Sequence, residues 1–175
     1  MNVTVYMGSN PGNKPAYKEA ARKLGMFIGE NGHTLVYGGS DAGLMGIVSN
    51  SVIEAGGQVV GVFPKSLKGI ESIHSELDKF IETDDLRERR AKMIALGDIF
   101  IALPGGPGTL EEIAEVMSLA RLDHLNGLCT LLNVEGYFDH LKAQYDKMVE
   151  DGFISSAERS RIVFLDSIED LKRLM

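Results

Sequence analysis

The chain of 175 residues fits one domain with a sizeable core, and its hydrophobic residues (44%) and charged residues (25%) are ordinary fractions for a soluble globular protein. Its formal net charge of −7 argues against a general nucleic-acid binder and gives no reason to expect an anionic membrane as partner. The single cysteine, Cys129, excludes an internal disulfide and fits a small buried hydrophobic residue. No apolar stretch approaches the ~20 residues of a membrane span, and no signal peptide precedes the first strand pattern, so we expect a cytoplasmic enzyme or binding protein.

Short apolar runs alternate with amphipathic stretches along the whole chain. Strands are predicted at Val3–Met7, His33–Tyr37, Gln58–Phe63, Phe80–Glu82, Asp98–Ala102, Leu128–Asn133 and Ile162–Phe164. Helices are predicted at Lys14–Asn31, Gly43–Ala55, Asp85–Leu96, Leu110–Arg121, Tyr137–Glu150 and from Ser167 onward. This alternation predicts an α/β fold with a parallel sheet covered by helices on both faces and joined by right-handed crossovers. The stretch Pro64–Asp78 has no clear periodicity, and is either an active-site flap or an irregular connection.

Three glycine-bearing turns follow predicted strands. They contain Gly8-Ser9 with Gly12, then Gly38-Gly39 with Gly43 to Gly46, and then Pro104-Gly105-Gly106-Pro107-Gly108-Thr109. Ligands of such sheets bind at the carboxyl ends of the strands, where these turns lie. One glycine turn means little, because turns use glycine for its positive φ. Three at one sheet edge predict an anion site, with a phosphate at the N-terminus of the helix after the third turn.

Two common nucleotide motifs are absent from these turns. The pattern G-x-G-x-x-G does not follow the first strand, and no acidic residue ends the second, so a standard NAD site is not expected. The lysine of a Walker motif is also missing, which argues against a P-loop NTPase.

The predicted helix Asp85–Leu96 supplies positive charge. Leu86, Arg89 and Met93 share one face by their spacing, which places Arg89 on or beside the packed stripe. An arginine there requires an anion, because an unpaired buried charge is costly. Two interpretations stay open: Arg89 holds a ligand, or it pairs with a structural carboxylate or extends to solvent. By spacing, Arg87, Arg90 and Lys92 lie elsewhere around the helix and are predicted to be solvated.

Glu111, Glu112 and Glu115 lie close to the start of the helix after the third turn. Acids near a helix N-terminus commonly compensate the helix dipole, and we expect at least one of the three to do only that. A phosphate at the same N-terminus would be repelled by them. A nearby arginine, or a carboxylate aimed at another part of the ligand, would resolve this conflict. The second arrangement is the one that hydrolysis of a glycosidic bond requires.

With these motifs in place, the chain resembles the Lonely Guy family of cytokinin riboside 5′-monophosphate phosphoribohydrolases, formerly described as possible lysine decarboxylases. The family signature P-G-G-x-G-T-x-x-E is complete as Pro104, Gly105, Gly106, Gly108, Thr109 and Glu112. The turn G-G-x-x-x-G-L-M-G is present from Gly38 to Gly46, and G-S-x-x-G from Gly8 to Gly12. The resemblance covers essentially the whole chain. It implies a Rossmann-like, doubly wound parallel sheet of three layers in a single domain, residues 1–175.

The resemblance also implies a reaction and a site. The reaction is hydrolysis of the N-glycosidic bond of AMP or an N6-substituted AMP, to free base and ribose 5-phosphate, without a cofactor or metal. Arg89 and Glu112 correspond to the catalytic residues. The residues implied in substrate or phosphate binding are Gly8, Ser9, Gly38, Gly39, Gly43, Met45, Arg90, Gly105, Gly106, Gly108, Thr109 and Glu111. Glu71 aligns only loosely with a family ligand contact, and the family forms dimers.

Some positions depart from the family pattern. In the motif M-H-x-R-K-x-x-M, Arg87 stands for histidine and Arg90 for lysine, which leaves the preferred base open. These changes favour an alternative function, a nucleotide-binding or carrier protein without turnover. Decarboxylation of an amino acid normally needs an electron sink such as pyridoxal phosphate on a lysine, and no lysine lies at a glycine turn.

The helices Asp85–Leu96 and Leu110–Arg121 are more apolar than one sheet face requires. A partner subunit or other helices of the same chain could cover them. Together with the resemblance, this predicts a homodimer whose sites lie close to the subunit boundary.

Overall fold

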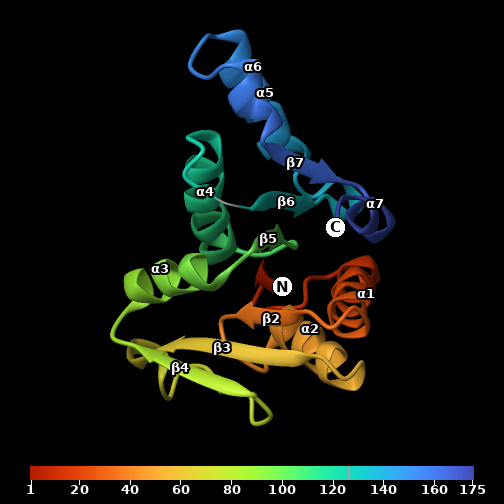
Figure 1. The fold of residues 1–175 in the computed structure, drawn as a ribbon, viewed down its shortest axis with the longest axis vertical. Coiled ribbons are helices and arrows are strands. Elements are labelled where there is room, and N and C mark those ends of the chain that lie inside the picture. Colours follow the sequence, from red (N-terminus) through yellow and green to blue (C-terminus); the bar gives the residue numbers. More distant parts are fainter. Residues whose placement is uncertain (126) are drawn as a thin grey trace.

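The computed structural model describes residues 1–125 and 127–175. All strands in these residues join one parallel sheet in the order β4-β3-β2-β1-β5-β6-β7 (Figure 1). The strands are β1 (Asn2–Tyr6), β2 (Thr34–Tyr37), β3 (Gln58–Pro64), β4 (Lys79–Thr83), β5 (Ile99–Ala102), β6 (Leu128–Leu132) and β7 (Ile162–Leu165). The chain winds outward from β1 to β4 and then returns to place β5 on the other side of β1. The sheet therefore reverses its winding direction at β1.

Helices cover both faces of the sheet. On one face lie α1 (Pro15–Glu30), α2 (Gly43–Glu54) and α7 (Ile168–Leu174), and on the other lie α3 (Leu86–Leu96), α4 (Pro107–Arg121) and α5 (Asp139–Glu150) (Figure 1). The short helix α6 (Ser156–Ser160) follows α5, and single 3₁₀ turns occupy Lys65–Leu67 and Val134–Gly136. Val3 and Val5 of β1 point into the α1/α2 layer, whereas Tyr6 points into the α3/α4 layer. The predicted doubly wound sheet of three layers is confirmed.

The predicted strands and long helices are all present, with differences at their ends. The helix predicted from Leu110 begins instead at Pro107, because proline suits the first helical position and Gly106 adopts the extended N-cap conformation. Helix α5 begins at Asp139 rather than Tyr137. Helix α6 was not predicted, although its signal is present: Ser155 and Glu158 form a capping box. As predicted, Cys129 is buried, and burial raises the pKa of its thiol to about 12.

The three glycine turns meet at the point where the winding reverses. The Gly8 N–H donates to the carbonyl of Pro104 at 3.2 Å, and the Leu44 N–H donates to the carbonyl of Gly8 at 3.1 Å. Gly43 has a φ of +55° and lies directly against the backbone of Ser9, where no Cβ fits. The turns therefore form one hydrogen-bonded unit at the carboxyl edge of the sheet.

None of the helices in residues 1–125 and 127–175 has the length and apolar composition needed to cross a bilayer.

The close packing of α1 on α2 depends on Gly25, and this gives a test of the fold. A Cβ at Gly25 would lie 2.5 Å from the carbonyl oxygen of Val48 and 2.6 Å from Cβ of Ser51, so the two helices would have to separate. We expect Gly25→Ala to destabilise the protein by about 1–3 kcal/mol, despite the higher helix propensity of alanine. Urea unfolding measures the change, and Lys18→Ala, at an exposed position of α1, is the control. Equal midpoints for Gly25→Ala and the parent would contradict this packing.

Candidate active site

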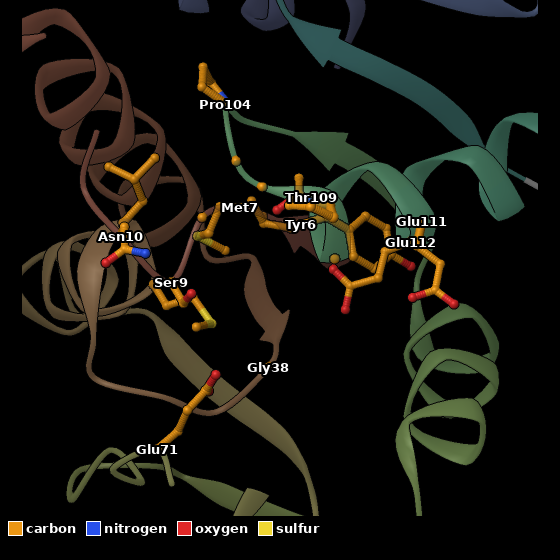
Figure 2. Close-up of a pocket in the computed structure, with 18 of the residues that line it drawn as sticks. Tyr6, Met7, Ser9, Asn10, Gly38, Glu71, Pro104, Thr109, Glu111 and Glu112 are labelled. Atoms are coloured by element: carbon orange, nitrogen blue, oxygen red, sulfur yellow. The ribbon is translucent and has the colours of Figure 1, made fainter. Parts of the chain in front are cut away.

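A cavity of about 500 Å³ opens at the carboxyl ends of β1, β2 and β5 (Figure 2). Its walls come from the three glycine turns, from α3 and α4, and from the stretch after β3. This is the position at which open α/β sheets bind ligands, outside the strand ends where the winding reverses. The geometry therefore agrees with the anion site predicted from the turns.

The N-terminus of α4 faces the cavity without a side-chain cap. The N-cap residue is Gly106, which has no side chain that could accept a hydrogen bond from the first helical turn. Pro107 follows as the first helical residue. The first-turn N–H groups of Gly108 and Thr109 are therefore available to an anion. A Cβ at Gly106 or Gly108 would meet no atom within 4 Å. These two glycines thus leave open space beside the helix N-terminus rather than relieving a contact within the protein.

Gly105 has the opposite role. A Cβ there would lie 2.8 Å from the backbone nitrogen of Gly8 and would collide with the side chain of Thr109. The hydroxyl of Tyr137 donates to the carbonyl of Gly105 from the turn after β6. Gly105 therefore fixes the third turn against the first and against the turn after β6.

Arg89 of α3 and Glu112 of α4 form an ion pair at the cavity wall. Nη2 of Arg89 donates to Oε1 of Glu112 at 2.7 Å, and the two side chains are only 13% and 10% exposed. Gly38 lies beside this pair: a Cβ there would be 3.6 Å from Nη1 of Arg89, an ordinary contact, and 3.2 Å from the sulfur of Met45. Arg89 therefore does pair with a carboxylate, and that carboxylate itself lines the cavity.

The pair sets the ionisation of Glu112 through two opposing effects. Burial raises the pKa of the Glu112 carboxyl above its ordinary value, and the charge and hydrogen bond of Arg89 lower it only in part. A carboxyl with a raised pKa in a cavity is a common mark of a functional site. Glu112 is thus a group whose charge depends on keeping Arg89 beside it.

Arg90 pairs with the other two acids of α4. Its Nη1 lies 3.0 Å from Oε1 of Glu111 and its Nε lies 3.0 Å from Oε2 of Glu115. Its side chain is 19% exposed and lines the cavity, so the prediction that Arg90 is solvated was wrong, because spacing along α3 alone could not show α4 beside it. Arg87 and Lys92 are exposed as predicted.

These contacts also resolve the predicted conflict between acids and phosphate. Since α4 starts at Pro107, none of its acids lies in the first helical turn. Each of Glu111, Glu112 and Glu115 has an arginine partner from α3. The helix N-terminus is thus left to an incoming anion.

Most of the residues predicted for the site line the cavity. They are Gly8, Ser9, Gly38, Met45, Arg89, Arg90, Gly105, Gly106, Gly108, Thr109, Glu111 and Glu112. Gly39 and Gly43 are not among the lining residues. Gly39 has a φ of +79° and its carbonyl accepts from the N–H of His74, so it holds the stretch after β3, while Gly43 packs against Ser9. These two glycines shape the turns around the cavity.

Other lining residues were not predicted. Leu67 and Glu71 come from the stretch Pro64–Asp78, which therefore borders the cavity as a flap would. Figure 2 shows Glu71 reaching in from the wall opposite Glu112. Tyr6, Tyr17 and Tyr137 add aromatic surface. Only the loose alignment of Glu71 pointed to any of these residues, because an aperiodic loop gives no pattern from which its contacts can be derived.

The lining suits a nucleotide better than a metal or a Schiff base. Within the described residues, no lysine or histidine lines the cavity, and no cluster of three or more His, Cys, Asp or Glu side chains can hold a metal ion. The lining offers two arginines, backbone N–H groups and carboxylates on a partly apolar surface. A phosphate, a sugar and a base are the groups that such a surface can bind.

Comparison with known proteins assigns the family. Residues 45–175 match the family model described as "Possible lysine decarboxylase". The cytokinin riboside 5′-monophosphate phosphoribohydrolase LOG1 of Arabidopsis thaliana is 43% identical over 97% of this chain and 79% of its own length. The cytokinin riboside 5′-monophosphate phosphoribohydrolase of Rhodococcoides fascians is 41% identical over 96% of this chain and 85% of its own length. The chain belongs to the family of these phosphoribohydrolases. The resemblance to the Lonely Guy proteins is thereby confirmed.

Solved structures confirm the fold. The molybdenum cofactor binding protein of Rippkaea orientalis superposes with a TM-score of 0.74 over 99% of this chain and 93% of its own, at 24% sequence identity. At this identity the likeness concerns the fold alone.

The buried ion pair yields a prediction about stability and pH. In Arg89→Leu the Glu112 carboxylate loses its partner, so we expect a loss of about 3 kcal/mol at neutral pH. The same change raises the pKa of Glu112 further. A carboxyl whose pKa is higher in the folded than in the unfolded state favours folding as the pH falls through the folded value, so the deficit should shrink in acid.

Urea unfolding of Arg89→Leu and the parent between pH 5 and 8 measures this deficit. The control is the double variant Arg89→Leu/Glu112→Gln, which has no carboxyl at position 112, so its deficit relative to the parent should not shrink in acid. A deficit of Arg89→Leu that is constant with pH would show that the Glu112 carboxylate does not depend on Arg89.

Proposed function

We propose that this protein hydrolyses the N-glycosidic bond of AMP or an N6-substituted AMP, releasing the free base and ribose 5-phosphate. The observation that carries the proposal is the buried Arg89–Glu112 pair in the same cavity as the uncapped N-terminus of α4. The named activity of the relatives, phosphoribohydrolysis of cytokinin riboside 5′-monophosphates, supports it. On this proposal, residues 1–175 act as one nucleotide-binding hydrolase domain that needs no cofactor.

The phosphate would bind where the glycine turns meet. The N–H groups of Gly108 and Thr109 would donate to its oxygens, and the dipole of α4 would favour its charge. The turn containing Gly8 and Ser9 forms the neighbouring wall. Binding energy gained at this end can then be used at the reacting carbon.

Glu112 would act at the sugar. It lies four residues after Gly108, about 6 Å along the helix axis, which is comparable with the length of a ribose 5-phosphate unit. There its carboxylate would stabilise the oxocarbenium-like transition state or orient the attacking water. The oxygen of water adds to C1′ and the C1′–N bond breaks, so the base leaves with one proton. Arg89 would hold Glu112 in place and keep more of it ionised.

The base would lie toward the wall formed by Leu67, Glu71 and Leu86. The two leucines offer apolar surface, and the carboxylate of Glu71 can accept a hydrogen bond from the N6 amino group of an adenine. Among nucleotide bases, this combination favours adenine over a base that presents an oxygen at the same position.

A nucleotide carrier without turnover is the second candidate, favoured by Arg87 and Arg90 at the positions of the family's histidine and lysine. The structure weakens this alternative, because Arg87 is exposed and Arg90 retains a positive charge in the cavity wall. Incubating the protein with AMP and with an N6-substituted AMP, and separating the products chromatographically, decides between the two. Release of free base supports the hydrolase, and tight binding with intact nucleotide supports the carrier.

Removal of the Glu112 charge should abolish most of the turnover while the fold and nucleotide binding persist. We expect Glu112→Gln to lower kcat by about 10²–10⁴-fold, because the charge is used mainly in the transition state. Product chromatography gives kcat, and calorimetric titration with AMP gives the dissociation constant. Arg89→Ala should lower kcat and raise the dissociation constant. A Glu112→Gln variant as active as the parent would exclude Glu112 from the chemistry.

The phosphate should decide the choice of substrate. We expect AMP to be hydrolysed at least about 10²-fold more efficiently than adenosine, because adenosine forgoes the binding energy at the α4 N-terminus. Gly108→Ala adds a methyl group at the proposed phosphate position, so it should reduce the ratio of the AMP efficiency to the adenosine efficiency. It should not lower the melting temperature. Gly105→Ala is the contrasting variant and should destabilise the fold. Equal kcat/KM values for adenosine and AMP would contradict this phosphate site.

We also propose that the protein is a cytoplasmic homodimer. Leu110 is 48% exposed and Leu86 is 40% exposed, although both lie on the helices that carry Glu112 and Arg89. Ala114, one turn after Leu110 on the same face of α4, is exposed as well. This apolar surface is what a partner subunit would cover.

Light scattering should give twice the mass of one chain, and Leu110→Asp should yield monomers with reduced activity, because the site helices lose their support. Leu174→Asp is the control, since Leu174 is similarly exposed (51%) at the end of α7 on the other side of the sheet. A fully active monomer at assay concentration would refute the dimer proposal.

A further inference from the structure

Tyr6 is a buried side chain at the cavity wall that the proposed mechanism does not use. It ends β1, is 1% exposed, and packs in the layer of α3 and α4 with Met93 and Ile113. Tyr6 also lines the cavity, and Figure 2 shows its side chain reaching past Thr109 toward Glu112. The phenol therefore lies at the cavity wall, beside Glu112.

The hydroxyl of Tyr6 is buried and has no hydrogen-bond partner among the described residues, and the same holds for Nε of Arg89. Leaving a buried polar group unpaired costs free energy that phenylalanine at this position would avoid. Burial, followed by the charge of Glu112, raises the pKa of the Tyr6 hydroxyl well above its ordinary value, so it stays a neutral donor. Two unpaired donors near one carboxylate indicate that an oxygen of the ligand belongs at this point.

The ligand oxygen must accept from a phenol and lie next to a carboxylate that only accepts. A sugar hydroxyl meets both conditions, because it accepts one hydrogen bond and donates another. Oε1 of Glu112 already accepts a hydrogen bond from Nη2 of Arg89. Residues 1–125 and 127–175 supply no hydrogen-bond donor to Oε2. With Glu112 at C1′, the hydroxyl within reach of both groups is the one on the adjacent carbon, C2′.

We propose that Tyr6 donates to the ribose 2′-hydroxyl, which in turn donates to Glu112, and that Tyr6 thereby selects ribonucleotides over 2′-deoxyribonucleotides. This inference rests on the proposed hydrolase function and adds a specificity-determining residue to it. In glycoside hydrolysis, hydrogen bonds to the hydroxyl adjacent to the reacting carbon strengthen in the transition state. Tyr6 therefore acts more on kcat than on KM.

The test compares Tyr6→Phe with the parent on AMP and on 2′-deoxy-AMP. We expect kcat/KM for AMP to fall about tenfold, mainly in kcat, and kcat/KM for 2′-deoxy-AMP to stay within about twofold. Comparing the two proteins on each substrate cancels the different intrinsic reactivity of the two sugars. The melting temperature of Tyr6→Phe should be unchanged or higher, because an unpaired buried hydroxyl is removed.

The matched control is Tyr37→Phe. Tyr37 ends the neighbouring strand β2, is fully buried and also has a hydroxyl without a partner in the described part of the chain, but it does not line the cavity. Tyr37→Phe should leave both substrates unaffected.

The outcomes separate the two proposals. Failure of the parent protein to release adenine from AMP would overturn the proposed function, and this inference with it. An active parent whose Tyr6→Phe variant loses the same factor on both substrates, or on neither, would overturn the role of Tyr6 alone.

Discussion

The ion pair between Arg89 and Glu112 is the interaction on which the site depends. It joins α3 to α4 across the end of β1, and it holds a carboxylate in a place where burial works against its charge. A buried pair of this kind contributes little net stability, because desolvation of both ions offsets their attraction. Its value is therefore chemical: Arg89 allows a carboxylate to lie against the apolar cavity wall in its charged form. The guanidinium also lies against Gly38, just after β2, so the turn that follows the neighbouring strand borders the same arrangement.

Charge is divided along α4 in a way that lets a phosphate and three acids share one helix. The first turn carries no acid and no side-chain cap, and its glycines leave space for an anion. The next two turns carry Glu111, Glu112 and Glu115, each paired with an arginine of α3. One helix can therefore bind the anionic end of a substrate and act on its sugar, because the two functions lie about one turn apart.

The sequence predicts the layers of this fold better than it predicts the site. Strand periodicity locates β1 to β7, because each strand is a short apolar run between turn residues. The sequence pattern predicts a start of α4 at Leu110, three residues late, because Pro107 and Gly108 are typical of turns although they belong to the first helical turn here. The family motifs found Arg89 and Glu112, but not the contacts of Arg90, which depend on the distance between two helices. Gly39 and Gly43 belong to the same motifs and serve the turns rather than the cavity wall. Motifs therefore identify which residues matter, and packing decides what each one does.

The fold by itself does not separate a hydrolase from a carrier, since a cofactor-binding protein shares it at a TM-score of 0.74. Both kinds of protein need an anion site at the glycine turns, and a carrier gains nothing from a buried carboxylate whose charge must be maintained by an arginine. Repulsion between that carboxylate and an anionic ligand would weaken binding in the ground state. Such a group is useful only where positive charge develops on the ligand, as it does at C1′ when a glycosidic bond breaks. The role proposed for Tyr6 follows the same logic, because its buried hydroxyl has no partner among the described residues and would gain one from a sugar oxygen in the site. The buried carboxylate of Glu112 and the buried hydroxyl of Tyr6 both cost free energy in the unliganded protein. On the proposed mechanism, both become favourable when the bond at C1′ of the substrate breaks.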